Sequence, residues 1–142
     1  ELGDLGKCEG RHLWPLIVKN CNLPASFYPD ATLRRHIHKQ LGAAGIVCSS
    51  GRFITLSCAS GDKERGDMIL ARYPDALCEN MEGAALARVC AHFQLPFAEL
   101  RCISNLVDDP DKQQWRLQEA CIRCGQAAAL LFQEDSWLHS LS

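Results

Sequence analysis

The sequence lacks any long hydrophobic run and any excess of charge of one sign. The longest apolar stretch covers residues 127–132, far short of the roughly 18 residues that a membrane-spanning helix needs. Fifteen Lys and Arg residues stand against 17 Asp and Glu residues, which gives a formal net charge of -2. That balance offers no electrostatic footprint for DNA, RNA or an anionic membrane. We therefore expect neither a nucleic-acid partner nor a membrane partner.

Internal repeats and low-complexity tracts are also missing. The chain starts at Glu1 without a basic region followed by an apolar one, so no signal peptide is expected. The 142 residues are 47% apolar and 23% charged, which is typical of one folded globular domain and too apolar for a disordered chain.

Cysteine, in contrast, is abundant. The nine Cys residues cannot pair completely within the chain, and several lie inside apolar stretches, among them Cys48, Cys58 and Cys90. Buried free cysteine behaves as a small hydrophobe, so we interpret these residues as reduced thiols of a cytoplasmic protein. The single Cys-x-x-Cys pair, Cys121 and Cys124, has no second pair of ligands at zinc spacing. No metal is therefore expected.

Turn residues divide the first third of the chain. Residues 1–30 carry Gly and Pro at short intervals and are expected to be irregular. Asp30 then precedes apolar residues at helical spacing, which predicts a helix that ends at Gly42 or Gly45.

Short apolar runs and helical patterns alternate through the rest of the chain. Segments 46–48 and 53–57 are predicted to form a β-hairpin around the Ser-Ser-Gly turn at 49–51. The later predicted elements are a helix over 63–72, a strand over 76–78, a helix over 81–93, a strand over 97–103 and a helix over 114–133. The apolar face expected for the helix over 81–93 consists of Ala85, Leu86, Val89, Cys90 and Phe93.

This alternation indicates an α/β domain with at least a partly parallel sheet. In such sheets, ligands bind where the carboxyl ends of strands meet the N-termini of helices. Two polar clusters occupy that position: residues 79–83 lie between a strand and a helix, and Ser104 and Asn105 follow the longest strand. When each cluster is taken alone, a structural role is favoured: Glu79 and Glu82 compensate a helix dipole, and Asn105 forms a turn.

Taken together, three segments resemble the nucleoside phosphorylase/hydrolase superfamily. Residues 79–85 read Glu-Asn-Met-Glu-Gly-Ala-Ala, residues 95–97 read Leu-Pro-Phe, and residues 100–105 read Leu-Arg-Cys-Ile-Ser-Asn. The superfamily carries Met-Glu-(Gly/Ala)-Ala, Pro-Phe and Arg-x-Ile-Ser-(Asp/Asn) in this order. The resemblance implies a three-layer α/β/α fold with a mixed sheet, incomplete at the N-terminus. It also implies that residues 1–142 form the C-terminal part of a single such domain.

Within the superfamily, the chain looks more like the futalosine hydrolases than the methylthioadenosine/adenosylhomocysteine nucleosidases. Asn105 stands where the latter have Asp, and residues 111–115 resemble a segment ending in Trp in the former. The resemblance implies a cytoplasmic homo-oligomer that hydrolyses futalosine, a small-molecule purine nucleoside of menaquinone biosynthesis, without a cofactor. A methylthioadenosine-type nucleosidase, a purine nucleoside phosphorylase, and a non-enzymatic remnant or binding module stay open as alternatives.

The resemblance also implies roles for individual residues. Glu82 is expected to accept hydrogen bonds from the ribose 2′- and 3′-hydroxyls, and Met81 is expected to pack against the sugar. Asn105 is the candidate catalytic residue. Its amide can donate to N7 and O6 of a 6-oxopurine such as hypoxanthine without titrating. Ser60 and Gly61 are expected to lie against the purine, although an ordinary helix cap explains them equally well.

Two further residues have open roles. Trp115 is expected either to close over the substrate or to cap the core. Arg101 is expected to form a structural ion pair with Glu99 or Glu82, because a buried Arg must be paired. By resemblance, the carboxylate that activates the attacking water is expected upstream of Glu1.

Overall fold

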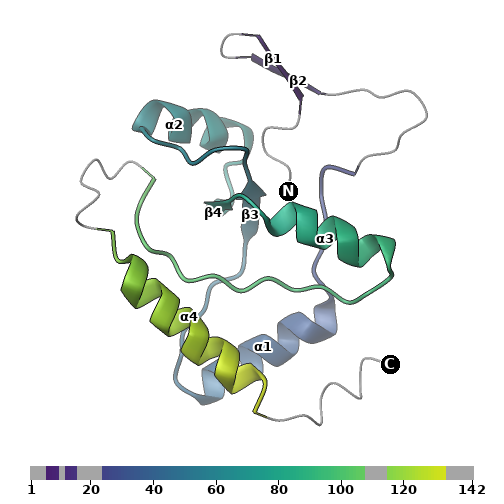
Figure 1. Cartoon of the computed structure of the whole chain (residues 1–142), viewed down its shortest axis with the longest axis vertical. Helices are drawn as coiled ribbons and strands as arrows, with labels where there is room; N and C mark the ends of the chain where they lie inside the picture. Colours follow the sequence, from purple (N-terminus) through teal and green to yellow (C-terminus); the bar gives the residue numbers. More distant parts are fainter. Residues whose placement is uncertain (1–5, 10–11, 16–23, 108–114, 134–142) are drawn as a thin grey trace.

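The computed structural model describes residues 6–9, 12–15, 24–107 and 115–133. Its elements are, in chain order, β1 (Gly6–Glu9), β2 (His12–Pro15), α1 (Ala31–Ala43), β3 (Arg52–Thr55), α2 (Lys63–Arg72), β4 (Ala76–Asn80), α3 (Gly83–His92) and α4 (Leu117–Leu131). Figure 1 shows β3 and β4 at the centre with α2 and α3 around them, and the α1–α4 pair below.

The strands β3 and β4 form a parallel pair, which confirms the predicted α/β class. The register places Phe53 opposite Cys78 and Thr55 opposite Asn80. The helix α2 connects the two strands, so the unit is a β–α–β crossover. Both strands therefore end at the same edge, and α3 begins just beyond that edge.

The helices α1 and α2 begin where the sequence predicts because each has an Asp cap. Oδ1 of Asp30 accepts the N–H groups of Thr32 and Leu33, both at 2.8 Å. Oδ1 of Asp62 accepts the N–H group of Arg65, also at 2.8 Å. Such caps satisfy N–H groups that have no partner inside the helix and contribute about 1 kcal/mol each.

Two separate apolar clusters hold the elements together. The first, between α1 and α4, consists of Leu41, Ala127 and Leu131. The second, between β3 and α2, consists of Ile54, Leu56 and Tyr73. Figure 1 shows residues 94–107 running between the two groups of elements, and Leu100 of this segment packs against the first cluster.

The predicted hairpin around residues 49–51 is wrong. Residues 46–50 form no strand, and β3 pairs with β4 instead. A Ser-Ser-Gly turn favours a local reversal, but the crossover buries Ile54 and Thr55 at the end of β3. Burial of apolar surface is worth more than the local turn preference.

The expectation of irregular structure over residues 1–30 is wrong in part. The strands β1 and β2 form an antiparallel pair in which Lys7 lies opposite Trp14. Strands of four residues are too short to give a detectable alternation of apolar and polar positions, so the pattern alone does not predict them.

The strand predicted over residues 97–103 does not form in this structure. The backbone is assigned no strand there, although the carbonyl of Phe97 accepts the N–H group of Asp30 at 2.7 Å. A strand requires a hydrogen-bonded neighbour, and none of the described strands pairs with this segment.

The helix α3 buries a different face from the one predicted. Its buried residues are Gly83, Ala84 and Ala87, whereas Leu86, Val89 and Phe93 are each more than half exposed. The small side chains allow α3 to lie close to β3. The large apolar side chains consequently point away from the described elements.

Candidate active site

The candidate site lies at the edge where β3 and β4 end and α3 begins. The hydroxyl of Thr55 donates to Oδ1 of Asn80 at 2.9 Å and accepts the N–H group of Ala84 at 2.9 Å. Oδ1 of Asn80 also accepts the N–H group of Gly83 at 2.8 Å. Two buried side chains thus satisfy the first N–H groups of α3 and fix the helix on the strand ends.

The carboxylate of Glu79, on β4, holds the turn that precedes α2. Its Oε1 accepts the N–H group of Ser60 at 2.7 Å. Ser60 is buried, and its hydroxyl has no hydrogen-bond partner among the described residues, whereas Gly61 is exposed. The two residues predicted to lie against a purine are therefore held beside the strand edge.

Met81 and Glu82 connect β4 to α3. Glu82 is the N-cap residue of α3, but its side chain makes no capping hydrogen bond. Its Oε2 accepts the N–H group of Met81 at 3.3 Å, and the side chain is 65% exposed. A carboxylate that is largely exposed, with one oxygen held by a backbone N–H group, is suited to binding hydroxyl groups of a ligand.

The predicted ion pair of Arg101 is confirmed, and it involves both expected partners. Nε of Arg101 donates to Oε1 of Glu99, and Nη2 lies 3.5 Å from Oε2 of Glu82. Burial acts to lower the pKa of Arg101, but the hydrogen bond and the charge of Glu99, together with the charge of Glu82, outweigh it and raise that pKa. The guanidinium therefore stays charged between two carboxylates.

Asn105 is half-buried, and its amide is oriented by its neighbours. Its Oδ1 accepts the hydroxyl of Ser104 at 2.6 Å, and its Nδ2 donates to the carbonyl of Leu106 at 2.9 Å. The segment also packs against α2, since a Cβ at Gly66 would lie 2.8 Å from Cγ1 of Val107. These contacts place the loop that carries Asn105 beside α2.

Trp115 precedes a residue, Arg116, whose backbone is bonded to this loop. The N–H group of Arg116 donates to the carbonyl of Ser104 at 2.8 Å, which ties the start of α4 to the residue before Asn105. Trp115 is half-buried, and its Nε1 has no hydrogen-bond partner among the described residues. Both roles expected from the sequence stay predictions.

Hydrogen bonds and ion pairs thus link the predicted site residues in two groups. One group runs from Ser60 through Glu79 and β4 to Glu82, and the other joins Asn105 to Trp115. Arg101 contacts Glu82 of the first group and lies on the same extended segment as Asn105, four residues before it in the sequence.

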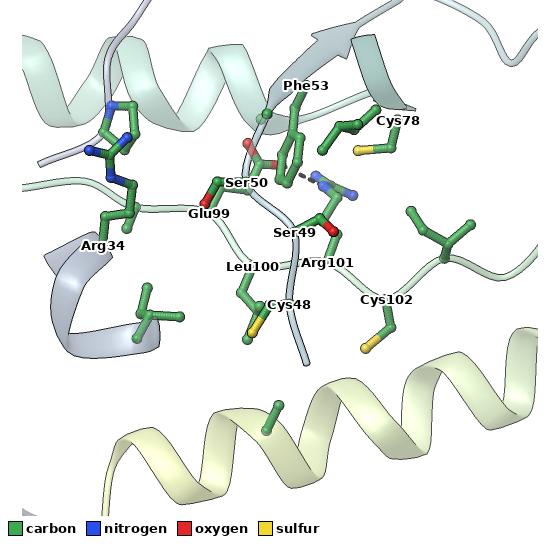
Figure 2. Close-up of a pocket in the computed structure, with 18 of the residues that line it drawn as sticks. Arg34, Cys48, Ser49, Ser50, Phe53, Cys78, Glu99, Leu100, Arg101 and Cys102 are labelled. Atoms are coloured by element: carbon green, nitrogen blue, oxygen red, sulfur yellow. Dashed lines mark hydrogen bonds and ion pairs between the residues drawn. The ribbon is translucent and has the colours of Figure 1, made fainter. Parts of the chain in front are cut away.

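A broad, open cavity of about 1390 Å³ lies nearby, between the β3–β4 pair and the α1–α4 pair. Figure 2 shows Phe53, Cys78, Leu100 and Arg101 among its lining residues. None of the six site residues predicted from the sequence lines it. The predicted site residues therefore lie outside this cavity, whose lining includes the start of α3 and the Glu99–Arg101 pair.

The charges of Arg101, Glu99 and Glu79 act on the thiol of Cys78. Burial, which the nearby Arg101 opposes and Glu99 and Glu79 reinforce, raises the pKa of Cys78 to about 11. Cys121 and Cys124 on α4 are free thiols, exposed and half-buried respectively.

Within the described ranges, no group of three or more His, Cys, Asp or Glu residues could hold a metal ion. None of the described helices is long and apolar enough to cross a membrane.

Sequence reasoning missed three contributors to the site. Thr55 and Asn80 organise the start of α3, and Glu99 lies against Gly83, where a Cβ would be 2.5 Å from Oε2 of Glu99. A polar residue at the end of each of two apolar strands was the available signal for Thr55 and Asn80. Glu99 was expected only as a partner of Arg101, and no local pattern marks its contact with Gly83, which lies far away in the sequence.

A profile of the phosphorylase superfamily matches residues 11–134. The chain belongs to this superfamily. The recognition made from residues 79–105 is thereby confirmed at the level of the superfamily.

The chain is 36% identical over 92 residues to a futalosine hydrolase of Streptomyces coelicolor, a match that covers 65% of this chain and 37% of that protein. It is 35% identical over 89 residues to a 5′-methylthioadenosine/S-adenosylhomocysteine nucleosidase of Shewanella denitrificans, covering 58% of this chain and 36% of that protein. The chain thus matches little more than a third of the length of these relatives.

A solved structure supports the same fold. The 5′-methylthioadenosine/S-adenosylhomocysteine nucleosidase of Neisseria meningitidis, in complex with methylthio-immucillin-A, superimposes with a TM-score of 0.74 at 19% identity. The match covers 92% of this chain and 62% of that one. The fold is therefore that of the nucleoside phosphorylases and hydrolases, as the sequence resemblance implies.

Proposed function

We propose that the protein hydrolyses the N-glycosidic bond of a purine nucleoside, with futalosine as substrate and hypoxanthine as the released base. The position of Glu82 is the observation that carries the proposal. Its exposed carboxylate lies at the carboxyl edge of a parallel strand pair and beside Arg101, in a chain of the phosphorylase superfamily. Relatives named as nucleosidases and futalosine hydrolases support this reaction.

The chemistry requires negative charge near the sugar. Cleavage of a glycosidic bond passes through an oxocarbenium-like transition state, in which positive charge develops on the ribosyl ring. In the proposal, Glu82 accepts the 2′- and 3′-hydroxyls and places its charge beside the developing cation. Met81, which is 40% exposed next to Glu82, packs its thioether against the ring.

Asn105 provides the group that addresses the base. An Asn side chain has two N–H donors and one carbonyl acceptor. The carbonyl of Asn105 is occupied by Ser104, and one donor is directed to Leu106, so the remaining N–H is available to a ligand. A donor suits the N7 and O6 acceptors of a 6-oxopurine. Ser60 and Gly61 line the base on the other side in this proposal, and Trp115 covers the ligand.

The proposal also covers the domain, the pathway and the assembly of the protein. Because the chain matches little more than a third of its relatives, we infer that residues 1–142 form the C-terminal part of one nucleoside phosphorylase-like domain. The proposed activity belongs to menaquinone biosynthesis and requires no cofactor. The proposed assembly is a homo-oligomer.

A second candidate is hydrolysis of methylthioadenosine. The identity to the Shewanella nucleosidase is 35%, close to the 36% found for the Streptomyces futalosine hydrolase. Asn105 distinguishes the two candidates. The adenine of methylthioadenosine carries a 6-amino group and needs a hydrogen-bond acceptor there, whereas the free N–H of Asn105 is a donor.

The test incubates the protein, expressed from its natural gene, with futalosine and separately with methylthioadenosine, with and without phosphate. Chromatography follows the released base. Release of hypoxanthine from futalosine without phosphate supports the proposal. Release of adenine supports the second candidate, and release only with phosphate indicates a phosphorylase. A folded protein that cleaves neither nucleoside contradicts both hydrolase proposals.

A further inference from the structure

Glu99 is a carboxylate that neither the sequence nor the comparisons assign to the site. Its side chain is 19% exposed, much less than that of Glu82. Both of its oxygens face the start of α3: a Cβ at Gly83 would lie 2.5 Å from Oε2 and 2.7 Å from Oε1. The N-terminus of a helix carries partial positive charge, so a carboxylate is favourable there. The absence of a side chain at Gly83 therefore creates the space that Glu99 fills.

Arg101 links this carboxylate to Glu82. Its Nε donates to Oε1 of Glu99, and its Nη2 lies 3.5 Å from Oε2 of Glu82. Figure 2 shows Glu99 and Arg101 on the same extended segment, with a dashed line between their side chains. The guanidinium is rigid and planar, so a bond at Nε also fixes the direction of the other two nitrogens.

The charges in this chain of contacts are unequal. Two carboxylates share one guanidinium, so one negative charge is left uncompensated. Glu99 makes the closer contact with Arg101, and Glu82 makes the longer one. The uncompensated charge consequently lies on Glu82, which is the more exposed of the two carboxylates.

We propose that Glu99 is a positioning residue for the hydrolysis proposed above: it binds Arg101 and thereby keeps Glu82 oriented and negatively charged toward the ribosyl group. This inference rests on the proposed function. Without the carboxylate of Glu99, Arg101 is free to bind Glu82 more closely. Glu82 then offers less negative charge to the oxocarbenium-like transition state.

The first test compares Glu99→Gln with a control, Asp67→Asn, in the protein expressed from its natural gene. Asp67 pairs with Lys63 at 2.7 Å on the exposed side of α2, so the control also removes one carboxylate from an ion pair. Rates are measured with whichever nucleoside the wild-type protein cleaves. We expect Glu99→Gln to lower kcat by about tenfold to a hundredfold. KM should change less, because the charge on the sugar develops only in the transition state. Asp67→Asn should retain wild-type rates.

The second test asks whether Glu99 acts through Glu82. Adding Glu99→Gln to Glu82→Gln should cause no further loss of kcat, because the group on which Glu99 acts is already neutral. An additive loss, or a Glu99→Gln variant as active as Asp67→Asn, overturns the proposal. If circular dichroism shows that Glu99→Gln is unfolded, Glu99→Asp takes its place in both comparisons. Its carboxylate is one methylene shorter and reaches Arg101 less well, so a smaller loss of kcat is expected, again with no further loss when Glu82→Gln is present. A wild-type protein without activity contradicts the proposed function instead.

Discussion

Thr55 and Asn80 are joined across two parallel strands by a 2.9 Å hydrogen bond, and each side chain also accepts one of the first N–H groups of α3. The pair is buried, so water cannot replace these bonds. The start of α3, and with it the position of Glu82, therefore depends on two side chains that do not face the ligand in the proposed reaction.

Replacing Thr55 by Val tests this dependence. The substitution keeps the shape but leaves Oδ1 of Asn80 and the N–H group of Ala84 with one hydrogen bond fewer. We expect the free energy of unfolding to fall by about 1–3 kcal/mol, the cost of unsatisfied buried polar groups. Urea denaturation measures it. The control Thr32→Val, at an exposed position of α1, should change it by less than about 0.5 kcal/mol. Equal stability of the two variants contradicts the role given to Thr55.

Gly83 and Gly42 provide a matched pair of helical glycines. A Cβ at Gly83 would lie 2.5 Å from a carboxylate oxygen of Glu99 and 2.9 Å from Oδ1 of Asn80, whereas nothing lies within 4 Å of a Cβ at Gly42. Gly83→Ala should therefore destabilise the protein by about 1–3 kcal/mol, because the site is already filled. Gly42→Ala should stabilise it by about 0.4–1 kcal/mol, since Ala restricts the unfolded chain. Thermal unfolding measures the midpoint temperature of each variant. Midpoints that shift in the same direction in both variants would contradict this prediction.

Cys78 should be an unreactive thiol in the folded protein. Because burial raises its pKa to about 11, almost none of it is thiolate near neutral pH, and the thiolate is the nucleophile. Cys58 is exposed and serves as the comparison. Brief treatment with iodoacetamide at pH 8, followed by peptide mass spectrometry, should label Cys58 well before Cys78. The rate at Cys78 should still rise between pH 9 and 11. Early labelling of Cys78 would show that its environment is not the one described.

The choice of base should change with Asn105→Asp. A neutral amide donor suits O6 of hypoxanthine, whereas a protonated carboxyl can donate to N7 and accept from a 6-amino group. We expect the ratio of kcat/KM for futalosine to that for methylthioadenosine to fall by at least about tenfold. Parallel assays of the two substrates measure the ratio. An unchanged ratio would remove Asn105 from base selection, whatever the effect on the overall rate.

The elements predicted correctly are those whose ends are marked by local chemistry. The helix α2 has the predicted bounds because Asp62 caps it and Tyr73-Pro74 follows it. The start of α1 was predicted from Asp30 for the same reason. Such signals depend on contacts within a few residues, so the sequence displays them directly.

The errors concern partners that are distant in the sequence. The turn chemistry at residues 49–51 predicted a hairpin, but β3 pairs with β4, which lies about twenty residues further on. The apolar residues of α3 predicted which side would be buried, but the small residues Ala84 and Ala87 were the ones that fit against β3. An apolar pattern shows which residues favour burial, but it does not show which element of the fold they can pack against.

The candidate site shows the same division. Met81, Glu82 and Asn105 could be predicted from the sequence because they lie in ordered segments that resemble one superfamily, and their roles stay predictions. The sequence predicted that Arg101 pairs with Glu99 or Glu82, but not that it contacts both, because the contact with Glu82 joins separate parts of the chain.

The two apolar clusters have a consequence for how this chain opens. They share no buried residue, and the connection between them includes the extended segment that carries Leu100. Cooperative units of a protein exchange their amide hydrogens together, and units with little shared contact exchange separately. We therefore expect the amide hydrogens of α1 and α4 to exchange separately from those of the β3–α2–β4 crossover. The hydrogen bond from the N–H group of Arg116 to the carbonyl of Ser104 should couple any such opening of α4 to the loop of Asn105.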